Sequence, residues 1–272
     1  MNRPATDTAF SGSIPELYES LMVPLIFESY AVDLARRVAA LEPARVLETA
    51  AGTGVVTRAM VRTLPAMVDV VATDLNQPML HHAAAADVGR PVEWKQADAS
   101  RLPFDDASFD VVVCQFGVSF FPDKPLAFSE ARRVLRRGGT FLFNVWDRLE
   151  ENEFAHVVTQ ELVRLFPADP PLFLQRTPHG YFDREKIAGH LVEAGFVAAP
   201  GFETIGAKSR AVSARVPAIA YCHGTPLRGE IESRERPSLE EATSACERAI
   251  AARFGAGPVE GRIQAHVVAV PR

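Results

Sequence analysis

A glycine turn and a distant carboxylate form the first pattern in this sequence that could do chemistry. The run ARVLETA (44–50) reads as a buried strand, and the turn AGTG (51–54) places Gly52 and Gly54 before a helix. Only glycine lets backbone approach a nucleotide this closely, because it has no Cβ. Asp74 follows Gly54 by 20 positions at the end of a second strand, where a carboxylate can accept both ribose hydroxyls. The pattern predicts a nucleoside site; a tight turn with a helix-capping aspartate is the alternative.

Two further residues favour a cationic ligand at this turn. Glu48 ends the first strand, where its charge would repel the pyrophosphate of a dinucleotide. S-adenosylmethionine carries a sulfonium and an ammonium and no phosphate, so an acid there favours it. A dinucleotide fingerprint also needs Gly or Ala three positions after Gly54, where this chain has Thr57. We therefore predict S-adenosylmethionine as the cofactor and keep NAD as the weaker alternative.

A second carboxylate ends the third predicted strand. Asp98 could accept the exocyclic amine of an adenine, and the N–H of Ala99 could meet a ring nitrogen. Asp98 alone is about as well explained as a turn residue.

Candidates for a catalytic base are weak. His179, Tyr181 and His223 lie in segments expected to face a substrate, and a base would help if the acceptor were a hydroxyl or a phenol. For each of the three, a structural or surface role is the stronger interpretation. The histidines and cysteines lack metal-ligand spacing, so we expect no metal site.

The elements that must position these residues follow an alternating pattern of apolar, Val-rich runs and amphipathic stretches, which is typical of βαβ units. We expect strands over 44–50, 66–74, 92–98, 109–116, 140–147, 201–211 and 259–270. We expect helices over 13–27, 55–62, 78–88, 125–137, 151–166, 183–195, 216–221 and 238–254. Gly138 and Gly139 should cap the helix over 125–137.

Composition excludes several classes of protein. The 272 residues are 47% hydrophobic and 23% charged, as in an ordinary globular protein, and carry a formal net charge of −5. That charge argues against a nucleic-acid partner. No signal peptide or membrane span is evident, and three widely spaced cysteines fit a reducing compartment. We predict a cytoplasmic protein with a small-molecule substrate.

Four ordered motifs resemble the class I S-adenosylmethionine-dependent methyltransferases, more narrowly the type-11 group similar to ubiquinone and menaquinone biosynthesis methyltransferases. The motifs are VLETAAGTG (46–54), VVATDLNQPML (70–80), QADASRLPFDDASFDVVVCQFGVSFFPD (96–123) and EARRVLRRGGTFLFNVWD (130–147). The family usually has glycine where this chain has Ala50, and we expect cofactor binding to survive that change.

The resemblance implies a set of cofactor contacts. Those at the methionine part are Glu48, Ala50, Gly52 and Gly54; those at the ribose and adenine are Asp74, Leu75, Asp98 and Ala99. Gln115 and Phe116 would close the site, and Tyr18 is a candidate lid residue from the amino-terminal segment.

The resulting fold expectation is a single α/β methyltransferase domain over 1–272. It has a Rossmann-like, seven-stranded, mostly parallel sheet with helices on both faces and an antiparallel last strand. We divide it into an N-terminal helical cover (1–41), a cofactor-binding core (42–147), a substrate-lid insertion (148–182) and the C-terminal part of the sheet (183–272).

The predicted activity is transfer of a methyl group from S-adenosylmethionine to a small molecule, by in-line displacement at the sulfonium methyl. Aromatic residues in the lid segments favour an apolar or aromatic acceptor. The alternatives are a non-catalytic S-adenosylmethionine-binding protein and, more remotely, an NAD-dependent oxidoreductase. The methylated atom and the oligomeric state are left open.

Overall fold

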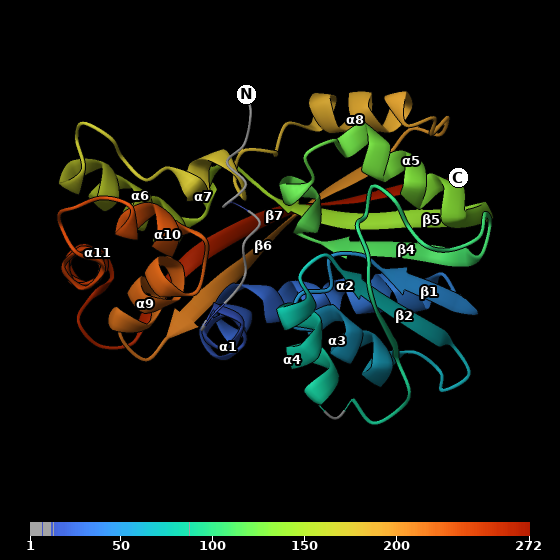
Figure 1. Ribbon diagram of the computed structural model, residues 1–272, viewed down its shortest axis with the longest axis horizontal. Coiled ribbons are helices and arrows are strands. Elements are labelled where there is room, and N and C mark those ends of the chain that lie inside the picture. The colour runs from blue at the N-terminus through green and yellow to red at the C-terminus, as the bar shows by residue number, and fades with distance from the viewer. Residues whose placement is uncertain (1–6, 8–11, 13, 87) are drawn as a thin grey trace. The chain divides into compact units, whose positions relative to one another are not determined.

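The strands of the chain form one mixed sheet (Figure 1). The computed structural model describes residues 7, 12, 14–86 and 88–272. The strand order is β3-β2-β1-β4-β5-β7-β6. Pairing is parallel from β3 to β5, whereas β7 runs antiparallel to β5, since Asp147 N–H donates to the Gln264 carbonyl and Gly138 N–H to that of Arg272. The strands are β1 (Arg45–Glu48), β2 (Asp69–Asp74), β3 (Glu93–Gln96), β4 (Phe109–Gln115), β5 (Leu135–Trp146), β6 (Gly201–Ala211) and β7 (Val259–Pro271).

This topology confirms the predicted fold class, including the antiparallel last strand. The α-helices are α1 (Ile14–Leu17), α2 (Glu28–Ala40), α3 (Val55–Thr63), α4 (Gln77–Ala85), α5 (Lys124–Val134), α6 (Glu153–Leu165), α7 (Phe173–Arg176), α8 (Arg184–Glu193), α9 (Arg215–His223), α10 (Leu227–Glu232) and α11 (Leu239–Phe254). Within the described residues, no helix combines the length and the apolar character that crossing a bilayer requires.

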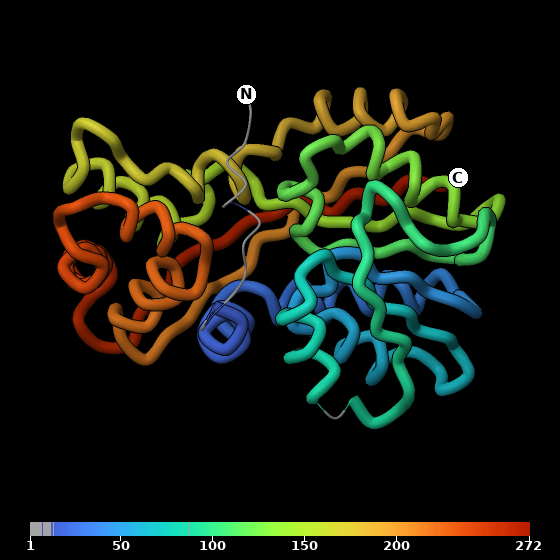
Figure 2. The backbone as a smooth tube through the Cα atoms, viewed as in Figure 1, coloured from blue at the N-terminus to red at the C-terminus, as the bar shows by residue number. Residues whose placement is uncertain are grey.

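The chain divides into two compact units. The first comprises residues 1–27, 146–181 and 206–265, and the second comprises 28–145, 182–205 and 266–272. The colours of Figure 2 show that each unit draws on stretches far apart in the sequence. We call the second the cofactor unit, because it holds every predicted cofactor residue except Tyr18, and the first the accessory unit.

The core of the cofactor unit follows the two-residue alternation of its strands. Val111 and Val113 of β4 and Leu142 of β5 pack in one cluster with apolar residues of α2 and α3. Phe141 and Phe143, which alternate with Leu142, instead contact Phe128 of α5 at 5.5 and 5.4 Å between ring centroids. Helices therefore cover both faces of this part of the sheet.

The predicted helix over 125–137 is wrong at its carboxyl end. Helix α5 ends at Val134, and Leu135 already pairs with Phe109 of β4. The carbonyls of Arg133 and Val134 also accept hydrogen bonds from the N–H groups of Ala107 and Ser108, respectively. Residues 135–137, which the local pattern assigns to the helix, therefore belong to β5. Gly138, at φ 79°, also lies within β5 rather than at a helix cap.

The sequence predicts one amphipathic α-helix over 13–27. The structure has helix there, but in two parts of different geometry. A π-helix over Tyr18–Phe27 follows α1 and contains Pro24, which has no N–H to donate to a preceding carbonyl. Such π turns are rare in proteins, and this one contains the residue that lacks an N–H donor. Tyr18 stacks on Phe27 with ring centroids 5.0 Å apart.

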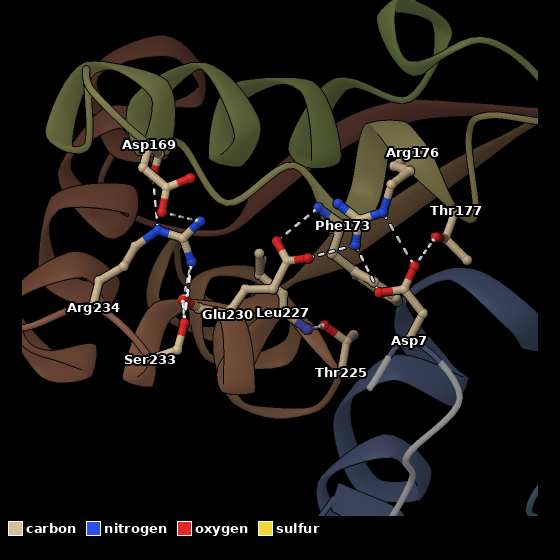
Figure 3. Close-up of polar contacts among 10 residues, drawn as sticks. All are labelled: Asp7, Asp169, Phe173, Arg176, Thr177, Thr225, Leu227, Glu230, Ser233 and Arg234. Carbon is tan, nitrogen blue, oxygen red and sulfur yellow. Dashed lines mark hydrogen bonds and ion pairs between the residues drawn. The ribbon is translucent and has the colours of Figure 1, made fainter. Parts of the chain in front are cut away.

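An arginine joins separate parts of the accessory unit (Figure 3). The Arg176 guanidinium donates two hydrogen bonds to the Asp7 carboxylate, at 2.6 and 3.2 Å, and forms an ion pair with Glu230 of α10. Thr177 donates to the same Asp7 carboxylate at 2.6 Å, and Glu230 also accepts the Phe173 N–H. The Asp7 side chain is only 2% exposed, so its charge depends on these donors.

A close approach of two loops shapes the cofactor unit where β1 and β4 end. Ala50 has φ 52°, a left-handed conformation that costs a non-glycine residue about 1 kcal/mol. A Cβ added at Gly117 would lie 2.4 Å from the Ala50 Cβ and 2.9 Å from the Cys114 sulfur. The absence of a side chain at Gly117 therefore leaves room for the methyl group at Ala50.

We predict a coupled effect of substitutions at these two positions. Gly117→Ala alone should destabilise the protein by about 1–3 kcal/mol because two methyl groups would overlap. Ala50→Gly should be close to neutral alone and should recover part of that loss in the double variant, with a coupling energy of about 1 kcal/mol. Urea unfolding of the four proteins measures this. Strictly additive losses would show that the two loops do not limit each other.

A second prediction concerns the arginine cluster. Arg176→Met should cost about 3–5 kcal/mol, since it leaves the buried Asp7 carboxylate without its cation. Arg164→Met is the matched control, because Arg164 also forms an ion pair, with Glu161, but its own side chain is 68% exposed. This substitution should change stability by less than about 1 kcal/mol. Equal effects in chemical denaturation would contradict the structural role assigned to Arg176.

Candidate cofactor site

The turn after β1 is held in place by both neighbouring strands. Thr49 N–H donates to the Val113 carbonyl of β4 and Ala51 N–H to the Thr73 carbonyl of β2, each at 2.9 Å. Gly52 N–H then donates to the Asp74 carboxylate at 2.8 Å. The turn is thereby fixed at the carboxyl ends of three parallel strands, the edge at which open α/β sheets bind ligands.

The two glycines of the turn meet different requirements. Gly52 and Gly54 have φ of 57° and 83°, which glycine adopts without steric cost. A Cβ at Gly54 would also lie 2.9 Å from the Trp94 ring and 3.2 Å from the Ala83 methyl. Gly54 is therefore needed for packing as well as for backbone conformation, and it immediately precedes the first residue of α3.

Asp74 lies at the end of β2 with part of its hydrogen-bonding capacity in use. One carboxylate oxygen accepts from Gly52 N–H, and the other accepts from Asn76 N–H at 2.7 Å. The Asn76 side-chain amide adds a longer contact at 3.4 Å, and the Leu75 N–H also donates. A carboxylate has about four acceptor sites, so ribose hydroxyls would take the place of the weaker donors. Burial is the largest influence on this group and raises its pKa, although the backbone donors oppose that shift.

Glu48 is almost completely enclosed, with 1% of the residue exposed. Its Oε2 accepts a hydrogen bond from the Thr57 hydroxyl at 2.5 Å. Burial raises the pKa of Glu48 to about 8; Thr57 and the charge of Arg58 lower it, and the charge of Asp74 raises it. The carboxyl group is thus poorly compensated and would gain from a cation.

The predicted adenine side is more open. Leu75, directly after Asp74, is 51% exposed, which suits a residue that lies against a flat apolar ring. Asp98 is exposed, and its Oδ1 accepts from the N–H and the hydroxyl of Ser100 at 2.8 and 2.7 Å. Ala99 is half-buried in the same turn. The turn geometry fits the alternative interpretation of Asp98, and a contact to adenine stays a prediction.

Gln115 and Phe116 follow β4 at the same edge of the sheet. Phe116 has φ 55° and is fixed by Asn144 of β5, whose Oδ1 accepts the Phe116 N–H at 2.9 Å. The Phe116 ring packs edge-on against Tyr30, with centroids 5.4 Å apart. Gln115 pairs in register with Asn144 and is half-buried. Both residues keep their predicted role as a proposal.

The remaining candidates belong to the accessory unit. Tyr18 is half-buried against Phe27. Tyr181 is buried, and burial raises its pKa. His223 Nε2 lies 2.9 Å from the Thr243 hydroxyl, which donates its own proton to the Leu239 carbonyl, so His223 is the donor. That bond favours a structural role for His223.

His179 has a defined tautomer. Its Nδ1 lies 3.0 Å from the Asp147 carbonyl, which can only accept, so Nδ1 carries the proton and Nε2 keeps a lone pair. Burial lowers the pKa of His179 to about 4, and the Asp147 carbonyl opposes that shift. The Nε2 atom is therefore unprotonated at neutral pH and can accept a proton or a hydrogen bond.

Sequence reasoning missed three residues that shape the site. From the sequence, Thr57 argues only against a dinucleotide. In the structure it lies in the first turn of α3, and its hydroxyl reaches back to Glu48 of β1. Gly117 carries no local signal in the sequence, since it acts through Ala50 of another loop. Asn144, which fixes Phe116, carries one signal, an asparagine within the otherwise apolar run FLFNVW (141–146).

The arrangement fits S-adenosylmethionine. A side chain at Gly54 would collide with Trp94, which keeps the backbone of the turn bare. The hydroxyl of Thr53 in the same turn is buried and has no hydrogen-bond partner among the described residues, as expected where a ligand supplies one. Glu48 and Asp74 add two buried carboxyl groups, and the nearby Arg58 guanidinium is hydrogen-bonded to the Thr53 carbonyl of the turn.

Comparison with known proteins agrees with this geometry. Residues 47–143 match the sequence profile described as a methyltransferase domain. The chain is 30% identical over 164 residues to the ubiquinone/menaquinone biosynthesis C-methyltransferase UbiE of Marinomonas sp. (strain MWYL1). That match covers 56% of this chain and 65% of the relative, so the chain spans just under two thirds of the relative's length.

Solved structures share the fold at low sequence identity. The phosphoethanolamine N-methyltransferase 2 of Haemonchus contortus, in complex with phosphomonomethylethanolamine and S-adenosylhomocysteine, aligns with a TM-score of 0.57 at 16% identity, over 98% of this chain and 59% of that one. The cyclase SpnF aligns with a TM-score of 0.53 at 16% identity, over 90% and 81%. Residues 47–143 thus match a methyltransferase domain, and the chain is similar to the class I S-adenosylmethionine-dependent methyltransferases in its sequence motifs and its fold.

Proposed function

We propose that this chain binds S-adenosylmethionine at the turn after β1 and transfers its methyl group to a small-molecule acceptor. The observation that carries the proposal is the pair of buried carboxyl groups, Glu48 and Asp74, on either side of a glycine turn. A ligand with a positive charge at one end and a ribose diol at the other complements both.

In this proposal each group of the site has one task. Asp74 accepts the ribose hydroxyls, and Glu48 faces the cationic methionine end. Leu75 covers the adenine, and Asp98 and Ala99 meet its edge. Gln115 and Phe116 close the site, and Tyr18 contributes from the amino-terminal segment. When bound, the cofactor supplies an already activated methyl group, so the protein mainly orients the acceptor and excludes water.

A proton acceptor is needed only if the acceptor atom carries a proton that must leave. We propose His179 for that task, ahead of Tyr181 and His223, on the basis of its own chemistry. Its Nε2 lone pair is available because Nδ1–H is committed to Asp147, and its low pKa keeps the ring neutral. We further propose an apolar or aromatic acceptor and a cytoplasmic location.

Calorimetric titration tests the cofactor. We expect saturable binding of S-adenosylmethionine and no response to NADH. Asp74→Ala should weaken binding by about 1.5–3 kcal/mol, because the ribose loses a charged acceptor and Gly52 N–H loses its partner. Asp69→Ala is the control, since Asp69 is exposed at the opposite end of the same strand, and it should leave the affinity unchanged. Binding of NADH alone would contradict the cofactor assignment.

Methyl transfer is tested by release of S-adenosylhomocysteine with phenols, quinols and small amines as acceptors. With a phenol, His179→Ala should lower kcat and leave cofactor affinity unchanged. Because the His179 pKa is about 4, the wild-type rate should show no titration of this group between about pH 6 and 8. Cofactor binding without turnover of any acceptor would favour the non-catalytic alternative.

A further inference from the structure

The Glu48 carboxyl group is buried without an ion pair. It is 1% exposed, and its side chain accepts one hydrogen bond, from the Thr57 hydroxyl. None of the described lysine, arginine or histidine side chains forms a salt bridge with it. An ionised carboxylate in such a place loses most of its hydration and regains little from a single neutral donor.

The charged and titratable groups around Glu48 do not remove this cost. Arg58 of α3 is near enough to favour the ionised form, but its guanidinium donates to the Thr53 carbonyl. Asp74 of β2 has the opposite effect. The Cys114 thiol of β4, whose pKa burial raises to about 12, stays neutral. Desolvation dominates, and with a pKa near 8 this carboxyl group is mainly protonated at neutral pH before a cofactor binds.

We propose that Thr57 is a positioning residue that orients the Glu48 carboxyl group within the site, and that binding of the cationic cofactor displaces one proton from Glu48 to solvent. This inference rests on the proposed function. The O–H bond of the carboxyl group breaks, the electron pair stays on the carboxylate, and the cofactor's positive charge replaces the proton. No oxidant or other reactant is required.

The Thr57 hydroxyl suits this role because of where it lies. It is fully buried in the first turn of α3 and reaches back to β1, so Oε2 is occupied and Oε1 is the oxygen left for a ligand. A hydroxyl can donate to the ionised form and accept from the protonated form, so it serves Glu48 in both states. Glycine or alanine at this position would leave the carboxyl group without an orienting partner.

The proposal predicts linked proton release, measured by titrating S-adenosylmethionine into the full chain at pH 7 in buffers of different ionisation enthalpy. Wild type should release close to one proton for each cofactor bound. Its Kd should fall about tenfold from pH 6 to pH 7, as expected when binding needs a carboxylate whose pKa lies near 8. The ligand's own amine stays protonated over that range.

Three variants separate positioning from simple loss of structure. Glu48→Gln should bind without proton release and with a flat Kd over pH 6 to 7. Thr57→Val keeps the shape but removes the hydroxyl, so it should weaken binding about tenfold at pH 7 and move the pH profile upward by about one unit. Thr57→Ser should restore the wild-type profile. Circular dichroism verifies that each variant is folded.

A measurement on the ligand-free protein tests the protonation of Glu48 independently. Its folded pKa lies above the unfolded value, so its contribution to stability is complete below about pH 4.5 and is lost as pH rises through 8. The melting temperature of Glu48→Gln relative to wild type should therefore be higher at pH 9 than at pH 5.

The outcomes distinguish the two proposals. Wild-type binding with no proton release, or an unchanged pH profile in Thr57→Val, would overturn this inference and leave the proposed function standing. Absence of S-adenosylmethionine binding by wild type at every pH would overturn both. Proton release that persists in Glu48→Gln would assign the titrating group to another residue, such as Asp74, and also overturn it.

Discussion

The hydrogen bond from the Gly52 N–H to the Asp74 carboxylate connects the two ends of the predicted cofactor site. It requires the backbone after β1 to turn left-handed at Ala50, Gly52 and Gly54 while Ala51 stays bonded to Thr73 of β2. Any Cβ at Gly54 would meet Trp94, and any at Gly117 would meet Ala50. The small residues in these loops are thus consequences of one constraint, the close packing of backbone at the edge of three parallel strands.

Electrostatics then decides which ligand this geometry suits. Glu48 and Asp74 are buried, and burial raises the pKa of both, which means that each carboxylate lacks sufficient compensation from the protein. A phosphate would raise these pKa values further, whereas a cation would lower them by favouring the ionised forms. The fold itself is less selective, since it is shared with a cyclase as well as with methyltransferases. The acidic residues therefore carry more of the functional argument than the topology does.

Local pattern succeeded where packing and periodicity agree. The strands over 201–211 and 259–270 were placed almost to the residue, because long runs with two-residue alternation have few other ways to bury one face. It failed at 135–139, where helical propensity and two glycines suggested a helix with its cap. There the ladder with β4 gives Leu135 a pairing partner that no local window contains. At Pro24 the helix was correctly expected, but its π geometry was not.

The sequence alone determined where the strands lie along the chain, the position of the glycine turn and the residue types at its edge, because these depend on short-range spacing. Only the tertiary structure decided which groups meet. Thr57 reaches Glu48, Asn144 fixes Phe116, and Arg176 binds both Asp7 and Glu230. Burial likewise raises the pKa of Glu48 and lowers that of His179. A pKa depends on the solvent and charges around a group, and those surroundings exist only once distant segments have packed together.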